Sequence, residues 1–172
     1  VTGVQTCALP ISDLDTAVLL VDADLRARRV QHLFGLDGEA GLVEHLTQGT
    51  PLPELLVNPG VERLVLLPAG HLQVQHTAEL LAARTLQHLV QELKTRYADR
   101  VVVVDLPPLL DTADALAFLP QVDSTLLVTE ASRTTLADVE RCTELLAPFP
   151  LMGTVLAPTG EAPRRGRRWW RR

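Results

Sequence analysis

The sequence is poor in aromatic residues, cysteine and lysine. Its 172 residues include three Phe, two Trp, one Tyr and two Cys, and Lys94 is the single lysine. Cys7 and Cys142 alone provide neither a disulfide framework nor metal-ligand spacing, so a reducing compartment is expected. No apolar run reaches the roughly 20 residues that a membrane-spanning helix needs. These absences point away from a small disulfide-rich fold, and no stretch of the sequence qualifies as a membrane span.

The sequence is rich in aliphatic residues, and its charges are unevenly distributed. Hydrophobic residues make up 47% of the chain and are mostly Leu, Val and Ala, a composition typical of α/β proteins. Residues 164–172 hold six of the sixteen basic residues, which leaves ten basic against twenty-one acidic residues elsewhere. Because an acidic surface repels phosphate backbones, we expect no nucleic-acid partner.

Aliphatic runs alternate with helical patterns from Asp13 onward. We predict strands at 17–21, 64–67, 101–104, 125–128 and 152–156, and helices at 41–47, 78–97, 113–119 and 136–146. Such alternation predicts right-handed βαβ units and an α/β fold, a mostly parallel sheet flanked by helices, over residues 13–157. The four valines at 101–104 predict a strand that is buried on both faces.

The two ends of the chain differ from this pattern. Residues 1–12 show neither strand alternation nor a helical stripe, and we interpret them as a leader that is disordered or not native to the protein. Residues 158–172 are rich in Pro, Gly and Arg and are predicted to be a disordered basic tail. Clustered arginines with Trp169 and Trp170 suit a weak contact with an anionic membrane surface. A solvated, disordered terminus is the favoured alternative, because six charges alone bind weakly at physiological salt.

Two of the predicted strands end in aspartate. One reads Leu-Leu-Val-Asp22-Ala-Asp24, and the other is four valines followed by Asp105 and a double proline. Ligands of parallel α/β sheets sit at the carboxyl ends of the strands, so these carboxylates should share one rim. An acid after an aliphatic strand is also how nucleotide-binding proteins hold Mg²⁺, usually through water. A single such aspartate could simply cap a turn, but the pair favours a magnesium site.

These motifs resemble those of a known family. The stretch LLVDADLRARRVQHLFGL is similar to the second aspartate motif, Walker A′, of the bacterial tyrosine autokinases of polysaccharide export, which are related to MinD and ParA. VVVVDLPPLLDTADALAF resembles their Walker B region, and the stretches before and after it match in order, from about Thr16 to Leu156. The subgroup encoded with exopolysaccharide and exosortase loci is the most similar.

The resemblance implies a P-loop ATPase fold and roles for five residues. Asp22 would lie near Mg²⁺ and the attacking tyrosine hydroxyl, with Asp24 assisting and Arg26 contacting phosphate or a neighbouring subunit. Asp105 would hold the water shell of the metal, and Pro107 would lie beside the cofactor. For Arg26, an ordinary surface salt bridge is an equal alternative.

The resemblance also implies the setting in which such a protein acts. ATP and Mg²⁺ are the cofactors of the family domain. Its partners are a membrane-anchored polysaccharide chain-length regulator and further copies of the kinase, at the cytoplasmic face of the bacterial membrane.

Three departures from the family pattern bear on activity. The sequence contains no G-x-x-x-x-G-K-[ST] phosphate loop, and Lys94-Thr95 lies within a predicted helix with no glycine near it. Ala157 and Pro158 stand where the family has an asparagine, and Tyr97 is the single tyrosine where the family has a tyrosine cluster. We therefore expect the first strand and its phosphate loop to be missing and this chain alone to be inactive. A MinD-like ATPase without kinase activity and a non-catalytic interaction module remain alternatives.

Overall fold

The computed structural model describes residues 16–158, which fall into two compact units. The first unit covers residues 16–121 and the second covers residues 122–158. The leader at 1–12 and the basic residues of the tail lie outside the described residues. Each unit is described by itself.

The first unit contains a parallel sheet of three strands. These are β1 (Ala17–Asp22), β2 (Leu64–Leu67) and β3 (Arg100–Asp105), in the order β2-β1-β3. The side chains of β1 are buried on both faces from Val18 to Asp22, as expected for a central strand. The predicted α/β fold with parallel strands between helices is confirmed, and all three predicted strand positions agree within one residue.

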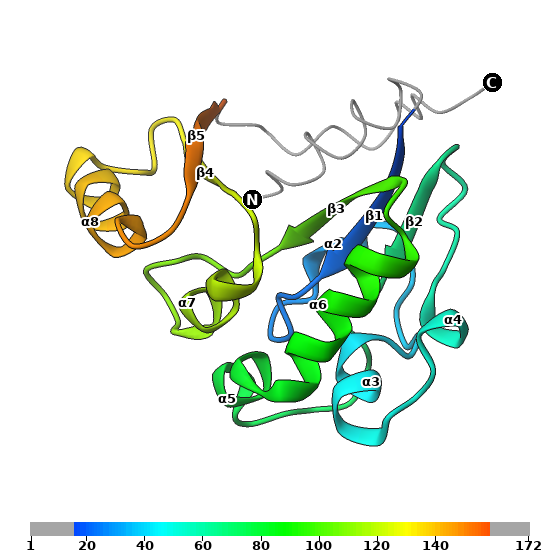
Figure 1. The fold of residues 1–172 in the computed structure, drawn as a ribbon. Helices are drawn as coiled ribbons and strands as arrows, with labels where there is room; N and C mark the ends of the chain where they lie inside the picture. Colours follow the sequence, from blue (N-terminus) through cyan, green and yellow to red (C-terminus); the bar gives the residue numbers. More distant parts are fainter. Residues whose placement is uncertain (1–15, 159–172) are drawn as a thin grey trace. The chain divides into compact units, whose positions relative to one another are not determined.

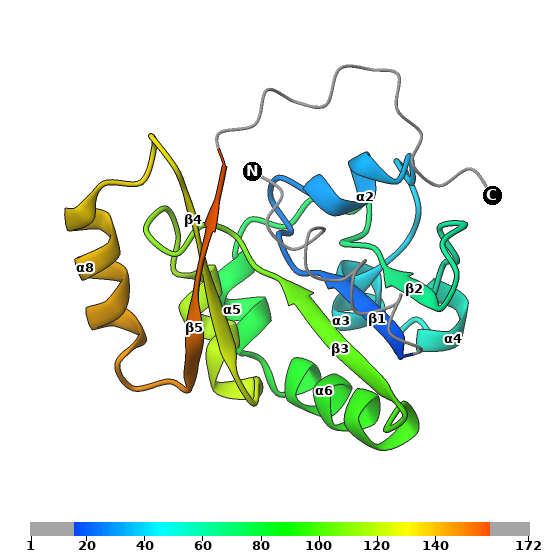
Figure 2. The ribbon, with the colours of Figure 1, turned by 90° about the horizontal axis from the view of Figure 1, so that it is seen from above.

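Helices cover both faces of this sheet (Figures 1 and 2). On one face Val30, from α2 (Arg29–Leu33), joins Val18, Leu20, Leu64 and Leu66 in a buried cluster. On the opposite face α6 (Arg84–Arg96) runs along the strands and buries Leu86, Leu89 and Leu93. The remaining helices of the unit are α3 (Leu42–Gln48), α4 (Leu52–Leu55), α5 (Thr77–Ala82), α7 (Asp114–Phe118) and the 3₁₀ helix η1 (Leu119–Gln121). The sequence pattern missed α2 and α4, which are too short to show a helical repeat.

The single helix expected at 78–97 is two helices. The chain breaks between α5 and α6 at Ala83, whose backbone is extended (φ −69°, ψ 155°). Leu81 and Leu86 are both buried, yet five helical residues would turn them about 140° apart. A continuous helix could not bury both leucines on one face, so tertiary packing overrides a local sequence of strong helix formers.

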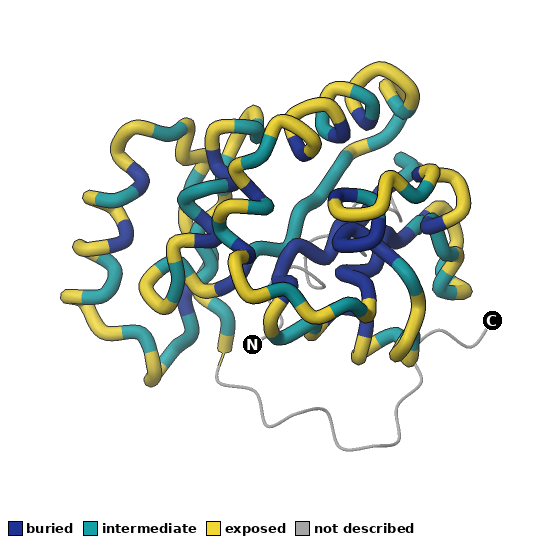
Figure 3. Tube along the Cα trace, turned by 90° about the horizontal axis from the view of Figure 1, so that it is seen from below, coloured by how far each residue is buried: buried dark blue, intermediate teal, exposed yellow. Residues whose placement is uncertain are grey.

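The expectation that β3 is buried on both faces is wrong. Val101 is 40% exposed and the next three valines are only half-buried. β3 pairs with β1 along one edge, and no strand among the described residues pairs with its other edge. Figure 3 shows that the fully buried positions of the first unit gather in its interior, while β3 is mostly intermediate. The valines therefore form an open, aliphatic sheet edge.

The second unit is a single βαβ element. The parallel strands β4 (Thr125–Glu130) and β5 (Leu151–Ala157) are joined by α8 (Leu136–Leu146). Thr135 caps α8: its hydroxyl accepts the amide N–H of Asp138 at 3.2 Å, which forms a capping box in the sequence Thr-x-x-Asp. Cys142 is buried in α8 as a free thiol. Among residues 16–158, no helix has the length and apolar character needed to cross a bilayer.

Candidate functional site

The carboxyl ends of β1 and β3 bring two aspartates side by side. Asp22 and Asp105 are paired positions in the parallel register of these strands, so their Cα atoms lie one strand spacing apart, about 4.8 Å. The backbone also links them, because the amide of Ala23 donates to the carbonyl oxygen of Asp105 at 2.9 Å. The prediction that both aspartates share one rim of the sheet agrees with this geometry.

The loop that follows β1 folds back around the carboxylate of Asp22. Asp22 is fully buried, and its two oxygens accept backbone N–H groups from Asp24 (3.2 Å) and Gln31 (3.0 Å). Asp24, 4% exposed, accepts the amide of Ala27 at 3.0 Å. The Asp-x-Asp sequence thus forms a compact turn in which both aspartates are held by backbone donors.

Burial and mutual repulsion raise the pKa values of two aspartates at this rim. Burial raises the pKa of Asp22 to about 6, against the lowering effect of its bond from Gln31. Burial, with the charges of Asp22 and Asp24, raises the pKa of Asp105 to about 7, and the nearby Arg29 offsets only part of this. Carboxylates gathered in this way favour a bound cation, because a cation would stabilise their ionised forms.

Arg26 is held by a buried carboxylate of the same unit. Its Nε donates to Asp114 at 2.9 Å, and the side chain of Asp114 is 2% exposed. The hydroxyl of Thr77 also donates to Asp114, at 2.6 Å. Arg26 therefore connects the loop after β1 to α5 and α7, although half of its side chain remains exposed. This is a partly buried ion pair rather than the surface salt bridge that sequence reasoning left open.

A second layer of polar residues supports the loop. Gln31 and Glu44 are nearly inaccessible and both bind the turn that follows β2. The amide group of Gln31 brackets Gly70, accepting its N–H at 3.1 Å and donating to its carbonyl at 3.3 Å. Sequence reasoning missed both residues, and also Asp114. The usable signal was the Pro-Ala-Gly turn itself, because a glycine lets the backbone of a turn come close to buried side chains.

The other expected site features are only partly present. Pro107 is buried and lies two residues after Asp105. Within residues 16–158 no three His, Cys, Asp or Glu side chains form a group that could hold a metal by themselves, so Mg²⁺ at the two aspartates would need water ligands. Lys94 and Thr95 lie exposed on α6, as expected, and not in a phosphate loop.

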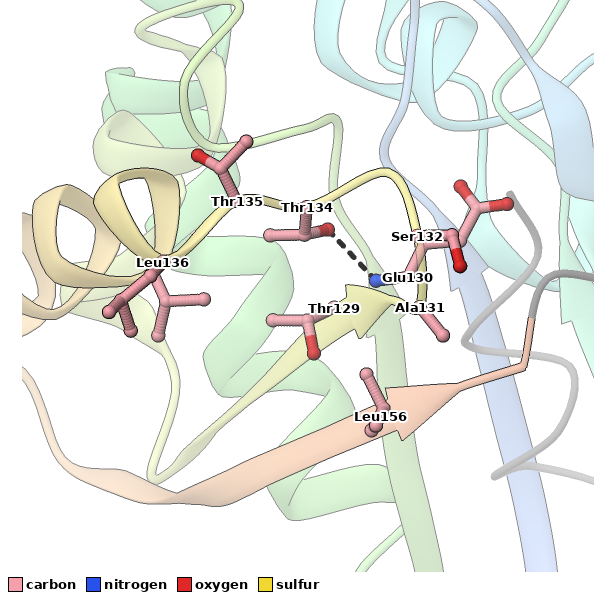
Figure 4. Close-up of a pocket in the computed structure, with 9 residues that line it drawn as sticks. Thr129, Glu130, Ala131, Ser132, Thr134, Thr135, Leu136 and Leu156 are labelled. Atoms are coloured by element: carbon pink, nitrogen blue, oxygen red, sulfur yellow. Dashed lines mark hydrogen bonds between the residues drawn. The ribbon is translucent and has the colours of Figure 1, made fainter.

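A pocket of about 390 Å³ lies in the second unit, away in sequence from all of these residues (Figure 4). Its lining comes from the end of β4, the start of α8 and Leu156 of β5. The loop at its mouth is held by the hydroxyl of Thr134, which accepts the amide of Glu130 at 2.9 Å. No residue of the Asp-x-Asp or Walker B motifs lines it.

Comparison with known proteins identifies relatives of this chain. No protein-family model matches it. It is 30% identical over 146 residues to the tyrosine-protein kinase YwqD of Bacillus subtilis, covering 85% of this chain and 60% of that protein. It is also 30% identical to the tyrosine-protein kinase Etk of Escherichia coli, over 78% of this chain but 18% of that protein. The chain therefore spans 60% of the length of one of these relatives and 18% of the other.

Solved structures agree with these sequence relatives. The kinase domain of VpsO superposes with a TM-score of 0.84 and 28% identity, over 92% of this chain and 78% of that domain. MinD of Pyrococcus horikoshii, solved with Mg-ADP, superposes with a TM-score of 0.72 and 21% identity, over 89% of this chain and 62% of that one.

The fold is thus that of a P-loop NTPase-like α/β domain, shared by tyrosine kinase domains and MinD. More specifically, the chain is a homologue of the bacterial tyrosine-protein kinases, and the resemblance noted in the sequence is confirmed.

Proposed function

We propose that this chain is part of an ATP-dependent protein-tyrosine kinase that regulates exopolysaccharide or capsule biosynthesis. The observation that carries the proposal is the rim formed by Asp22, Asp24 and Asp105, with two raised pKa values and little compensating positive charge. Perturbed carboxylates clustered at the carboxyl end of a parallel sheet are typical of a cation-assisted site. The kinase relatives provide the reaction class.

The rim suits a magnesium ion bound through water. Asp22 and Asp105 would accept hydrogen bonds from its water ligands, and Asp24 would add negative charge to the same side. When bound, Mg²⁺ neutralises charge on phosphate oxygens during transfer. The protein's own contribution is positional: the backbone amides of Asp24 and Gln31 fix the carboxylate of Asp22 and keep it from rotating away.

The phosphates of ATP need more than the described residues supply. No glycine-rich loop opens a helix within residues 16–158. The open edge of β3, with its half-buried valines and Asp105 at its end, suits a further parallel strand whose loop would reach this rim. By itself the chain should then bind Mg-ATP weakly, and isothermal titration that gives a micromolar dissociation constant would refute this.

Completing the domain tests the kinase proposal. Residues 16–172 would be fused to a strand, phosphate loop and helix taken from a tyrosine kinase relative, and ATP turnover and tyrosine phosphorylation measured. Asp22→Asn and Asp105→Asn should each abolish turnover, because each removes a charge beside the metal. Asp99→Asn, at an exposed position just before β3, is the matched control and should retain turnover. Wild-type turnover in either rim variant would contradict the proposal.

A MinD-like ATPase is the second candidate, favoured by the shared fold and by a single, half-buried tyrosine. Tyr97 lies under the guanidinium of Arg100, 5.1 Å from the ring centre, and is poorly placed as a phosphate acceptor. ATP hydrolysis by the completed domain without phosphotyrosine on any substrate protein would favour this candidate.

The setting proposed for the kinase follows its relatives. It would work at the cytoplasmic face of the membrane, pair with a membrane-anchored chain-length regulator and assemble with further copies of itself. Co-purification of the completed domain with the cytoplasmic segment of such a regulator tests the pairing, and light scattering tests the assembly.

A further inference from the structure

Gln31 connects two loops at the carboxyl end of the first sheet. It lies in the short helix α2, is 2% exposed, and uses its backbone and its side chain for different partners. Its backbone N–H donates to Asp22 at 3.0 Å. Its side-chain amide makes two hydrogen bonds to the backbone of Gly70, in the turn after β2. The position of the donor to Asp22 therefore depends on an anchor 39 residues away in sequence.

The turn that anchors Gln31 is itself rigidly held. Glu44 accepts the backbone N–H groups of His71 (3.0 Å) and Leu72 (2.9 Å) through one carboxylate oxygen, and that of Gly41 (2.6 Å) through the other. Burial alone would raise the pKa of Glu44, but these backbone donors lower it, so the carboxylate stays charged near neutral pH. The turn is thus fixed by charge-assisted hydrogen bonds in a poorly hydrated place.

Close packing around the turn leaves no room for side chains at two glycines. A Cβ atom on Gly70, where φ is +107°, would lie 2.1 Å from an oxygen of Glu44. A Cβ atom on Gly41 would lie 2.1 Å from the carbonyl oxygen of Pro68. Glycine is therefore required at both positions, and the turn packs closely against α3.

We infer that Gln31 is a positioning residue, which transmits the rigidity of the turn at 68–72 to the carboxylate of Asp22. Loss of its side-chain amide would detach α2 from Gly70 and let the backbone donor drift from Asp22. The carboxylate would then lose one of its backbone donors, which also include Asp24 and Val30, and with it a defined orientation toward a cation. The effect on cation binding rests on the proposed function; the coupling between Gly70 and Asp22 does not.

Amide hydrogen exchange in the 172-residue chain tests the coupling. Gln31→Met keeps the length of the side chain and removes the amide group, while Gln87→Met makes the same change at an exposed site on α6. In Gln31→Met, exchange at the amides of Gln31 and Asp24 should be about ten- to a hundredfold faster, the effect of losing buried hydrogen bonds. The amides of β1 should change by less than about twofold, and Gln87→Met should change none of them.

Two results would overturn the inference. Unchanged exchange at Gln31 and Asp24 would show that Gly70 does not hold the loop. Equal acceleration throughout β1 would show that Gln31 only stabilises the fold. If Gln31→Met does not fold, Gln31→Asn replaces it: the amide group is kept on a side chain one methylene shorter, so both hydrogen bonds to Gly70 are weakened and faster exchange at the same two amides is expected.

A metal titration separates this inference from the proposed function. Mn²⁺ alone is the probe, and its paramagnetic broadening of signals around Asp22 and Asp105 reports binding. The concentration giving half-maximal broadening should rise about tenfold or more in Gln31→Met, as for lost outer-shell contacts, and stay unchanged in Gln87→Met. Equal Mn²⁺ affinity in Gln31→Met and wild type would refute the positioning role. Absence of broadening in the wild-type chain would refute the metal site, while the exchange experiment would still decide the role of Gln31.

Discussion

Replacement of Asp105 by Asn should stabilise the metal-free chain near neutral pH. The structure shows no hydrogen bond from the described residues to the carboxylate of Asp105, so Asn loses no partner there. What it removes is a charge disfavoured by burial and by Asp22 and Asp24. The pKa of Asp105 rises from 3.8 to about 7, and a rise of this size corresponds to a loss of at most about 4 kcal/mol in folding stability. A cluster of carboxylates that destabilises the metal-free fold is expected where residues are retained for function rather than for stability.

The raised pKa of Asp105 makes the stability gained by Asp105→Asn depend on pH. Because the folded-state pKa of Asp105 is raised, the folded chain binds more protons than the unfolded chain between about pH 4 and pH 7, and its stability falls as pH rises through that window. The advantage of Asp105→Asn should therefore be largest near pH 8 and fall below about 1 kcal/mol near pH 4. Urea unfolding in EDTA at both pH values measures it, with Asp99→Asn as an exposed control. An advantage that does not change with pH, or destabilisation near pH 8, would refute the reasoning.

Two further predictions concern packing and the tail. Gly41→Ala should destabilise the first unit by about 1–3 kcal/mol in thermal unfolding, because its Cβ would meet the carbonyl of Pro68 at 2.1 Å. Gly153→Ala is the control and should be tolerated, because no atom lies near its Cβ position. Equal stability of the two variants would contradict the close approach at Gly41. Removal of residues 164–172, which lie outside the described residues, should reduce pelleting with anionic liposomes at low salt, and equal pelleting with and without them would end the membrane proposal.

The sequence by itself determined the strands and the rim of aspartates. Buried parallel strands are aliphatic over their whole length, so β1 and β2 could be predicted without any knowledge of the strands beside them. Asp22 and Asp105 each follow such a strand directly, and parallel pairing places strand ends together. The Thr135 cap is also set by local sequence, because its partner, Asp138, is three residues away. Features set by local sequence, or by strand direction alone, could be predicted.

Only the tertiary structure decided how these residues are held. Arg26 reaches Asp114 across 88 residues, and Gln31 reaches Gly70 across 39, and no local pattern encodes such pairs. The break at Ala83 arises because α5 and α6 must bury leucines in different directions, against a local preference for one helix. The exposure of β3 likewise depends on whether another strand pairs with its second edge, and a run of four valines does not indicate this. Long-range polar pairing and edge occupancy are properties of the assembled fold, because both depend on which segments folding brings together.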